Sequence, residues 1–391
     1  MPTLSSALDP RSVIVLAGVM GLLMSLVMFS MRRSYPSSIR GLREWTLAPL
    51  ICFGSTVLFA MRGVLPDVLT IPLANMVLFQ GCITYYAGSQ LFLGHARNTR
   101  GWSIVTPVLG AVLFWYSQFQ PSYTVRLAVF TVAIAALFTA HASLYLRHPL
   151  THLGLRVMTG LLVLQATVAA LRFVTVLLGE AGTNLLEATW LQVVYIVMYS
   201  FTALLMSIAG VLMATDRVRV EFEFMATHDP LTGVLNRRAL FAQSQKAFAR
   251  SQRGETPMAL LMLDADHFKR INDAFGHQTG DEVLRELAQR LQGPLPASAH
   301  LGRYGGEEFL AVLPGLTPDA AHAVAERVRA DLARPFDAGS RLADAGIERL
   351  TVSIGMASFR GAADTLDAML ARADAALYRA KAAGRDRVEV A

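Results

Sequence analysis

The sequence predicts an all-α membrane bundle of about seven helices followed by an α/β domain. Three observations support this prediction. Hydrophobic residues make up 53% of the 391 residues and charged residues only 16%, a balance typical of membrane proteins. Apolar runs of roughly 17 to 25 residues, long enough to cross about 30 Å of hydrocarbon, recur through the first half. After residue 214 the pattern changes to short apolar strands alternating with amphipathic helices.

Seven apolar runs define the predicted spans. They cover about residues 12–31, 46–63, 69–93, 102–118, 123–146, 154–178 and 189–214. The first run lacks a small-residue cleavage site and is followed directly by Arg32 and Arg33, so we expect a retained helix rather than a signal peptide. Both cysteines, Cys52 and Cys82, lie inside apolar runs, which excludes a disulfide framework or a thiolate metal site.

The charged residues indicate how the bundle is oriented. Residues 1–215 contain 12 Arg, no Lys and 5 acidic residues, whereas residues 216–391 contain 23 basic and 24 acidic residues. A basic excess confined to the membrane half reflects topology, and the second half offers no basic patch to nucleic acid. Positive residues in short loops stay on the cytoplasmic side, so alternate loops are predicted to be cytoplasmic. These loops contain Arg32, Arg33, Arg40, Arg43, Arg97, Arg100, Arg147 and Arg156. The N-terminus is then outside and the α/β domain is in the cytoplasm.

Two arginines, Arg126 and Arg172, lie inside predicted spans, where a charge is costly and often marks a functional cavity. An outward-facing cavity for an anionic ligand is one interpretation, but we favour snorkelling of both side chains toward the interface. Single polar residues could contribute to such a cavity, although in bundles they more often form interhelical hydrogen bonds. These residues are His141, Gln80, Gln165 and Gln192.

Residues 215–227 combine mixed charges with apolar residues at helical spacing, so the last span is expected to continue as a helical signalling linker. Val218, Phe222 and Met225 fall three to four residues apart and provide a seam for a partner helix or for the chain's own domain. The predicted parts are therefore a transmembrane domain at 1–214, a linker at 215–227 and an α/β domain at 228–391.

The α/β domain is predicted from the order β-α-α-β-β-α-β-α-β. Strands are expected at 258–263, 301–304, 307–313, 350–359 and 387–390, and helices at 267–275, 281–291, 318–333 and 365–382. Gly305 and Gly306 form the turn of a hairpin between the second and third strands, and Gly384 follows the last helix. This order implies a sheet with helices packed against it.

Acidic side chains follow two of these strands. Asp264 ends the first strand, and Glu307 and Glu308 follow the glycine turn. Carboxylates at strand ends are the hard oxygen ligands that Mg²⁺ prefers, and Gly305 and Gly306 leave room for a nucleotide beside the backbone. Each feature taken alone also fits an ordinary strand end or turn.

Four segments in the right order resemble the GGDEF family of diguanylate cyclases. They are DPLTGVLNRR at 229–238, DADHFKRINDAFGHQTGD at 264–281, RYGGEEF at 303–309 and DAALYRAKAAGR at 374–385. The resemblance covers residues 222–391 and implies a palm-like fold, close to that of nucleotidyl cyclases, with a largely antiparallel sheet. It also implies condensation of two GTP into cyclic di-3′,5′-GMP with loss of two pyrophosphates, in the cytoplasmic (inner) membrane of a bacterium.

The resemblance assigns roles to the acidic residues. Two Mg²⁺ ions would be held by Asp264, the backbone carbonyl of Ala265, and Glu307, with Glu308 supporting the second ion. Glu307 would also act as the base for the attacking 3′-hydroxyl. Two metal ions so held stabilise charge on a phosphoryl group under attack.

Substrate-binding residues are implied in the same way. Guanine presents N1–H and N2–H₂ donors, and Asn272 and Asp281 match the family's guanine-binding positions, with side chains able to accept them. His277 matches a third substrate position, with packing in a helix–loop contact as the alternative. The remaining implied residues are Lys269, Lys381 and Arg385, which would bind phosphates, and Gly305 and Gly306, which border the nucleotide.

Each domain would bind one GTP, so the resemblance implies a homodimer, held by the linker and the membrane helices, with the membrane half sensing an unknown ligand. A catalytically silent GGDEF domain that senses GTP or docks a partner is the alternative, and a seven-span transporter with a regulatory tail is a third. Many family members have an inhibitory Arg-x-x-Asp product site. Here that window reads Pro296–Ala299, so tight feedback inhibition through it is not expected.

Overall fold

The computed structural model describes residues 9–149, 152–187, 189–337 and 339–391. The chain divides into two compact units, Met1–Val220 and Glu221–Ala391. The first unit is built from helices, and the second combines helices with one five-stranded sheet. The last helix of the first unit runs without a break through residues 215–227, where a continuous helix was predicted.

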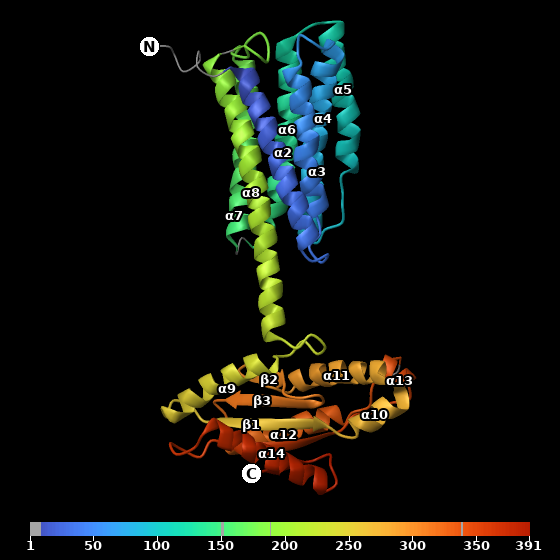
Figure 1. Cartoon of the computed structure of the whole chain (residues 1–391), viewed down its shortest axis with the longest axis vertical. Coiled ribbons are helices and arrows are strands. Elements are labelled where there is room, and N and C mark those ends of the chain that lie inside the picture. The colour runs from blue at the N-terminus through green and yellow to red at the C-terminus, as the bar shows by residue number, and fades with distance from the viewer. Residues whose placement is uncertain (1–8, 150–151, 188, 338) are drawn as a thin grey trace. The chain divides into compact units, whose positions relative to one another are not determined.

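The helical unit has a helix over each of the seven predicted spans (Figure 1). The third begins with a π-helical turn that contains Pro72, whose ring removes a backbone N–H from the helix ladder. In chain order the elements are α2 (Pro10–Ser34), α3 (Leu42–Ala60), η1 (Leu69–Leu73) with α4 (Ala74–Phe92), α5 (Arg100–Gln118), α6 (Tyr123–Leu146), α7 (Leu153–Leu177) and α8 (Trp190–Thr227).

Four of these helices, α2, α6, α7 and α8, are long and apolar enough to cross a membrane, judged by length and composition over the described residues. They are consistent with membrane association of this unit. The count of seven spans and the orientation with the N-terminus outside stay predictions.

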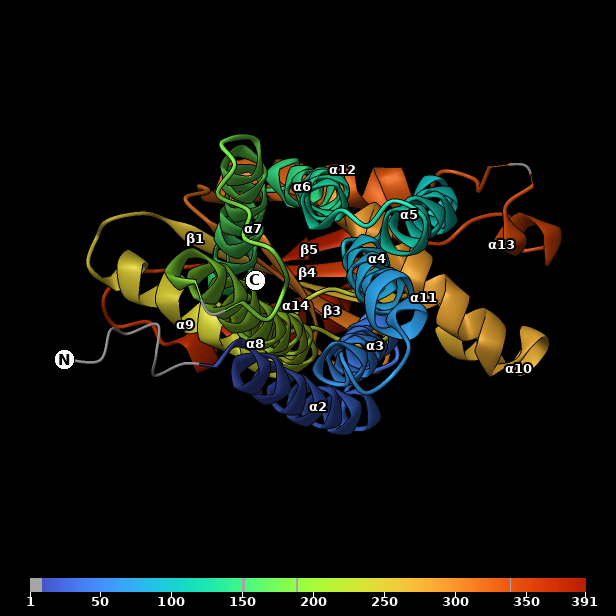
Figure 2. The ribbon, with the colours of Figure 1, turned by 90° about the horizontal axis from the view of Figure 1, so that it is seen from above.

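Polar side chains link neighbouring helices of the bundle. Seen from above, α8 lies beside α2 and α7 (Figure 2). His141 of α6 shares a hydrogen bond of 2.8 Å with Ser89 of α4, and Gln165 of α7 donates to the carbonyl of Tyr199 in α8 at 3.4 Å. The prediction that single polar residues act as interhelical partners is confirmed for these two side chains.

The snorkelling interpretation is wrong for Arg172. Its side chain is only 3% exposed and lies in the interior of the helical unit, where the guanidinium donates to Gln192 Oε1 of α8. A snorkelling side chain would instead direct its guanidinium out of the bundle. Arg126 is half-buried. Gln192 is thus a third interhelical partner.

The α/β unit contains every strand and helix that the sequence predicted there, plus α9 and the short α13. Helix starts carry side-chain caps: Asn236 accepts from the backbone N–H of Ala239, and Thr365 accepts from that of Ala368. The elements are α9 (Arg237–Gln252), β1 (Met258–Ala265), α10 (Phe268–Phe275), α11 (His277–Gln292), β2 (His300–Arg303), β3 (Glu308–Pro314), α12 (Pro318–Leu332), α13 (Arg341–Asp344), β4 (Val352–Ser358), α14 (Leu366–Ala382) and β5 (Val388–Val390).

The sheet has the order β2-β3-β1-β4-β5, with β1 at its centre. All pairs are antiparallel except β4 with β5, so the sheet is mixed and largely antiparallel, as predicted. Residues of β1 alternate between two apolar layers: Leu261 and Leu263 pack with α11 and α12, whereas Leu260 and Met262 pack with α9 and α14. The helices therefore cover both faces of the sheet.

The start of α11 differs from its prediction. The helix begins at His277, four residues before the predicted 281, because Gly276 takes a φ of 83° that turns the chain sharply after α10. Helix α9 was not predicted, although its buried residues recur at helical spacing: Leu240, Ser244, Ala247, Phe248 and Ser251.

Gly355 of β4 allows α14 to approach the sheet closely. A Cβ at this position would collide with backbone atoms of Ala373 and Leu377. We expect Gly355→Ala to destabilise residues 221–391 by about 1–3 kcal/mol, the usual cost of overpacking, in urea unfolding. Gly293→Ala is the matched control, because a Cβ there meets only Arg290 O at 3.8 Å. Equal unfolding midpoints for the two variants would contradict this account of the helix–sheet contact.

Candidate nucleotide-binding site

The end of β1 places a buried acid beside a lysine. Asp264 pairs across the sheet with Glu308 of β3 on one side and with Ser353 of β4 on the other. Asp264 is only 5% exposed, and its Oδ2 lies 2.7 Å from Nζ of Lys381 on α14. A buried carboxylate needs such a partner, because its charge is costly in a low-dielectric interior.

Two acids of this site have raised pKa values. Burial is the main cause of the raised pKa of Asp264, opposed by Lys381 and increased by Asp266. Burial also raises the pKa of Glu307, and the negative charges of Asp264 and Glu308 add to it, with Lys381 opposing. These acids therefore lie close enough to repel one another, and a cation among them would relieve that repulsion.

The glycine turn after β2 is held by an arginine that was quoted in a motif but given no role. Arg303 donates to the carbonyl of Gly306 through Nε at 3.0 Å and Nη2 at 2.7 Å. Its Nη1 lies 3.1 Å from Oδ1 of Asp229. Burial alone would raise the pKa of Asp229, but hydrogen bonds from Thr232 and the Arg303 guanidinium outweigh it and hold the pKa below its usual value. The segment just after α8 is thereby joined to the turn that precedes Glu307.

The turn itself is tight. The carbonyl of Glu308 accepts from the backbone N–H of Tyr304 at 2.8 Å and of Gly305 at 3.2 Å. A Cβ at Gly305 would come within 2.6 Å of Glu308 Oε2, whereas a Cβ at Gly306 would meet nothing within 4 Å. Gly305 is therefore needed to fit the Glu308 side chain, and the backbone at Gly306 is open to an approaching group.

The predicted guanine-binding residues lie on α10 and α11. Asn272 is half-buried on α10, while His277 and Asp281 are exposed near the start of α11. A Cβ at Gly280 would collide with Asn272 Oδ1, so this glycine, which the sequence analysis did not single out, sets the position of the Asn272 amide. Lys269, also on α10, is exposed.

The predicted site residues form two groups. Asp264, Glu307, Glu308 and Lys381 meet at the ends of β1 and β3, and Arg385 lies near enough to influence Asp264. The second group, on α10 and α11, contains Lys269, Asn272, His277 and Asp281. Within the described residues, no direct side-chain hydrogen bond or ion pair joins the two groups.

Asp266 was missed although it lies two residues beyond Asp264. Its carboxylate accepts from Thr351 Oγ1 at 2.9 Å, from Ser353 Oγ at 2.7 Å and from the backbone N–H of Asp386 at 3.1 Å. It joins β4 to the segment after α14, which carries Arg385. The period of two in a strand was the available signal, since it places 264 and 266 on one face.

Asp386, which follows Arg385, forms an ion pair and has an unusual backbone conformation. It has a φ of 43°, a left-handed conformation that Asp tolerates better than most residues. Its Oδ1 lies 3.0 Å from Nη1 of Arg329 on α12, so the acid makes an ion pair with Arg329. The neighbouring Arg385, three residues after the end of α14, also has a positive φ, 65°.

The donor set fits a hard divalent cation. Carboxylates of Asp264 and Glu307 and the carbonyl of Ala265 are oxygen ligands of the kind that Mg²⁺ takes, and the raised pKa values of both acids favour a positive neighbour. Among the described residues, no group of three or more His, Cys, Asp or Glu side chains is arranged to hold a metal ion. The Asp264 carboxylate forms an ion pair with Lys381.

Known proteins resemble the C-terminal part of the chain. Residues 226–387 match the family described as "Diguanylate cyclase, GGDEF domain". Diguanylate cyclase DgcP of Pseudomonas aeruginosa is 45% identical over 168 residues, which are 42% of this chain and 24% of that protein. Response regulator PleD of Caulobacter vibrioides is 42% identical over 167 residues, which are 42% of this chain and 36% of that protein. The C-terminal unit therefore contains a GGDEF domain.

A solved structure is similar over the same region. The GGDEF domain of DgcB from Caulobacter crescentus, in complex with c-di-GMP, has 35% identity and a TM-score of 0.39, covering 42% of this chain and 93% of that one. The chain spans between about a quarter and about a third of the length of the curated relatives named above. The helical unit lies outside the matched residues.

Glu307→Gln removes a charge that the folded state disfavours. Because the pKa of Glu307 is raised, the ionised side chain lowers folding stability, and this loss grows as pH rises through the folded-state pKa. We expect the variant to stabilise residues 221–391 at neutral pH by less than about 1 kcal/mol, since solvent screens this partly exposed group. The gain disappears below the ordinary pKa of 4.5, where Glu307 is protonated in both states.

Urea unfolding at neutral and at acidic pH measures this difference. Glu348→Gln, at an exposed position, is the control and should change neither midpoint. A Glu307→Gln variant that is less stable than the parent at neutral pH contradicts the charge balance described for this site.

Proposed function

We propose that the chain is a membrane-bound diguanylate cyclase that condenses two GTP into cyclic di-3′,5′-GMP and two pyrophosphates, under control of its helical unit. The observation that carries the proposal is the Asp264–Lys381 contact of 2.7 Å beside Glu307, inside a GGDEF domain. Acids and cations at one site suit a triphosphate bound with a metal ion. The names of the relatives support the activity.

The chain's own residues have separate roles in the proposed reaction. Asp264, Glu307 and the carbonyl of Ala265 would hold Mg²⁺, with Glu308 in support, and the ion would neutralise charge that develops on the phosphates. Lys381 and Arg385 bind the triphosphate as cations, and Lys269 does so from α10. The 3′-hydroxyl oxygen of one GTP forms a bond to the α-phosphorus of the other, pyrophosphate leaves, and Glu307 accepts the hydroxyl proton. The raised pKa of Glu307 suits this proton transfer.

Selection of guanine rests on α10 and α11. Asn272 and Asp281 accept hydrogen bonds from the guanine edge, and His277 lies between them in the chain. Adenine would leave the Asp281 carboxylate facing an acceptor, which favours GTP over ATP. The open backbone at Gly306 admits the nucleotide, and Gly305 leaves room for the Glu308 side chain beside it.

Two such domains must face each other, so the active form is a homodimer. Phe222 and Met225, on the part of α8 that continues past residue 215, are 59% and 52% exposed, which supports a seam against a second α8 rather than packing within the chain. Val218 instead packs against the core of the helical unit. A small shift between paired domains would misplace the attacking hydroxyl and slow the reaction strongly, so control is geometric.

Product analysis tests the activity. Full-length protein in nanodiscs is incubated with GTP and Mg²⁺, and the nucleotides are resolved by mass, with Glu307→Ala and Asp264→Ala as inactive variants and Glu348→Gln as the matched control. Cyclic di-GMP from the parent and the control alone is the expected result. Product from Asp264→Ala at the parental rate contradicts the proposed site.

A folded dimer that binds GTP without turnover would favour the silent-domain alternative. Forced dimerisation of residues 216–391 then separates that alternative from a missing activating signal, since only a competent domain gains activity on pairing.

Gly280→Ala tests the guanine-binding role of Asn272. The added methyl displaces the Asn272 amide, so we expect KM for GTP to rise at least about tenfold, with a smaller change in kcat, as follows from losing a hydrogen bond to the bound base. Gly293→Ala, on the other end of α11, is the control. Steady-state kinetics measures both, and an unchanged KM in Gly280→Ala excludes this role for Asn272.

A further inference from the structure

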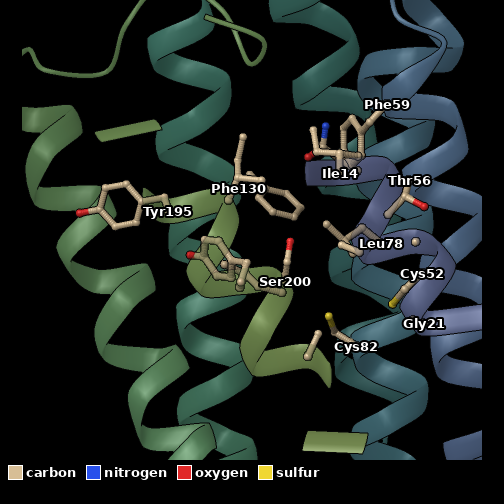
Figure 3. A pocket seen from close by; sticks show the side chains of 18 of the residues that line it. Ile14, Gly21, Cys52, Thr56, Phe59, Leu78, Cys82, Phe130, Tyr195 and Ser200 are labelled. Atoms are coloured by element: carbon tan, nitrogen blue, oxygen red, sulfur yellow. The ribbon is translucent and has the colours of Figure 1, made fainter. Parts of the chain in front are cut away.

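A cavity of about 340 Å³ lies within the helical unit. Residues of α2, α3, α4, α6, α7 and α8 line it, and most of them are apolar (Figure 3). Its volume falls at the lower end of the range for small-molecule pockets, roughly 300–1,000 Å³. Nothing in the GGDEF domain or its proposed reaction uses this space.

One part of the cavity wall contains a buried cation. Arg172 of α7 is 3% exposed, donates to Gln192 Oε1, and has its guanidinium carbon 4.7 Å from the centre of the Tyr195 ring. Gln192 is held in turn by a bond of 3.2 Å from its Nε2 to the carbonyl of Leu185. Tyr123 of α6 lies 3.5 Å from Gln192 Oε1. The site around Arg172 is therefore built from three helices.

This part of the wall has a net positive charge. Arg62 and Arg126 also line the cavity, and Tyr123 lies within electrostatic range of both and of Arg172. The Asp67 carboxylate lies within electrostatic range of Arg62 and Arg126. Over the residues that the structure describes, no carboxylate lies within 4.0 Å of Arg172. An arginine in so apolar an interior is favoured by an anionic partner.

The rest of the wall is mostly apolar, with single polar side chains such as Ser200 and Thr56, and suits a hydrocarbon chain. Phe130 of α6 and Leu78 of α4 point into the cavity from different helices, and Cys52 and Cys82 face each other farther along (Figure 3). A ligand that satisfies both parts of the wall must have an anionic head and an apolar chain. The volume is too small for a lipid with two long chains.

We propose that this cavity binds a single-chain amphiphile with a carboxylate head group, with the head at Arg172 and the chain between Phe130 and Leu78. A carboxylate accepts two parallel hydrogen bonds from a guanidinium, which makes Arg172 a suitable anchor. The membrane supplies such amphiphiles directly, because their chains partition into it.

The ligand contacts the helix that leads toward the GGDEF domain. Gln192, Tyr195 and Tyr199 of α8 all line the cavity, and α8 continues to Thr227, two residues before Asp229. A head group at Arg172 competes directly with Gln192 for the same guanidinium. Occupancy of the cavity therefore changes the contacts of α8. An effect of this change on turnover rests on the proposed cyclase function, whereas ligand binding does not.

Direct binding is measured with radiolabelled dodecanoate and full-length protein in detergent micelles, at a pH where the acid is ionised. We expect saturable binding of one molecule per chain. Unlabelled 1-dodecanol, which has the same chain without the charge, and phosphatidylglycerol, which has two chains, should compete at least about tenfold more weakly than dodecanoate. These comparisons need only the parental protein.

Arg172→Gln should weaken binding at least about tenfold, because one partner of a buried charged pair is lost. Arg100→Gln, the same change at an exposed arginine outside the cavity, should leave binding unchanged. Absence of saturable binding, competition by 1-dodecanol or phosphatidylglycerol as strong as that by dodecanoate, or unchanged affinity in Arg172→Gln would each overturn the proposal.

Cyclase turnover measured on the same samples separates ligand binding from its effect on the cyclase. A change in rate on adding dodecanoate, absent in Arg172→Gln, supports coupling through α8. Saturable, Arg172-dependent binding with a constant rate overturns the coupling alone. The same binding in a protein that makes no cyclic di-GMP contradicts the proposed function and leaves the ligand site intact.

Discussion

The charge balance at the end of β1 is the constraint on which the rest of the α/β unit depends. Asp264 is buried in the central strand, and Lys381 of α14 lies against its carboxylate at 2.7 Å. Keeping that contact requires β1 and α14 to hold a fixed register, and Gly355 provides the close approach of α14 to the sheet. The same burial raises the pKa of Asp264 and leaves a site that favours cations.

Hydrogen bonds from residues near both ends of the domain stabilise this site. Asp266 ties β4 to the segment that carries Arg385, and Asp229 ties the chain just after α8 to Arg303 and so to the carbonyl of Gly306. The second connection is notable for control, because it joins the end of the long helix to the turn beside Glu307 through two side chains. A change at that helix end has a short bonded path to the proposed base.

The strands of the sheet and most helices of both units could be predicted from the sequence, because each has a clear period and glycine, proline or capping residues at its ends. Features that depend on contacts between distant residues could not. Residue 280 must be glycine because a Cβ there would collide with Asn272 of the preceding helix. The role of Arg303 depends on Asp229, 74 residues away. Whether Arg172 snorkels or faces inward depends on how α7 rotates in the bundle, which a uniformly apolar helix does not encode.

The central claim is that the acids around Asp264 form a metal-dependent nucleotide site, and equilibrium binding tests it without any turnover. Binding of a non-hydrolysable GTP analogue to the full-length protein is measured with Mg²⁺ and with a chelator, for the parent and for Asp264→Asn. The account predicts that the parent binds the analogue much more tightly with Mg²⁺ and that Asp264→Asn loses most of this difference. Equal affinity with and without Mg²⁺ in the parent, or an unchanged Mg²⁺ effect in Asp264→Asn, would contradict it.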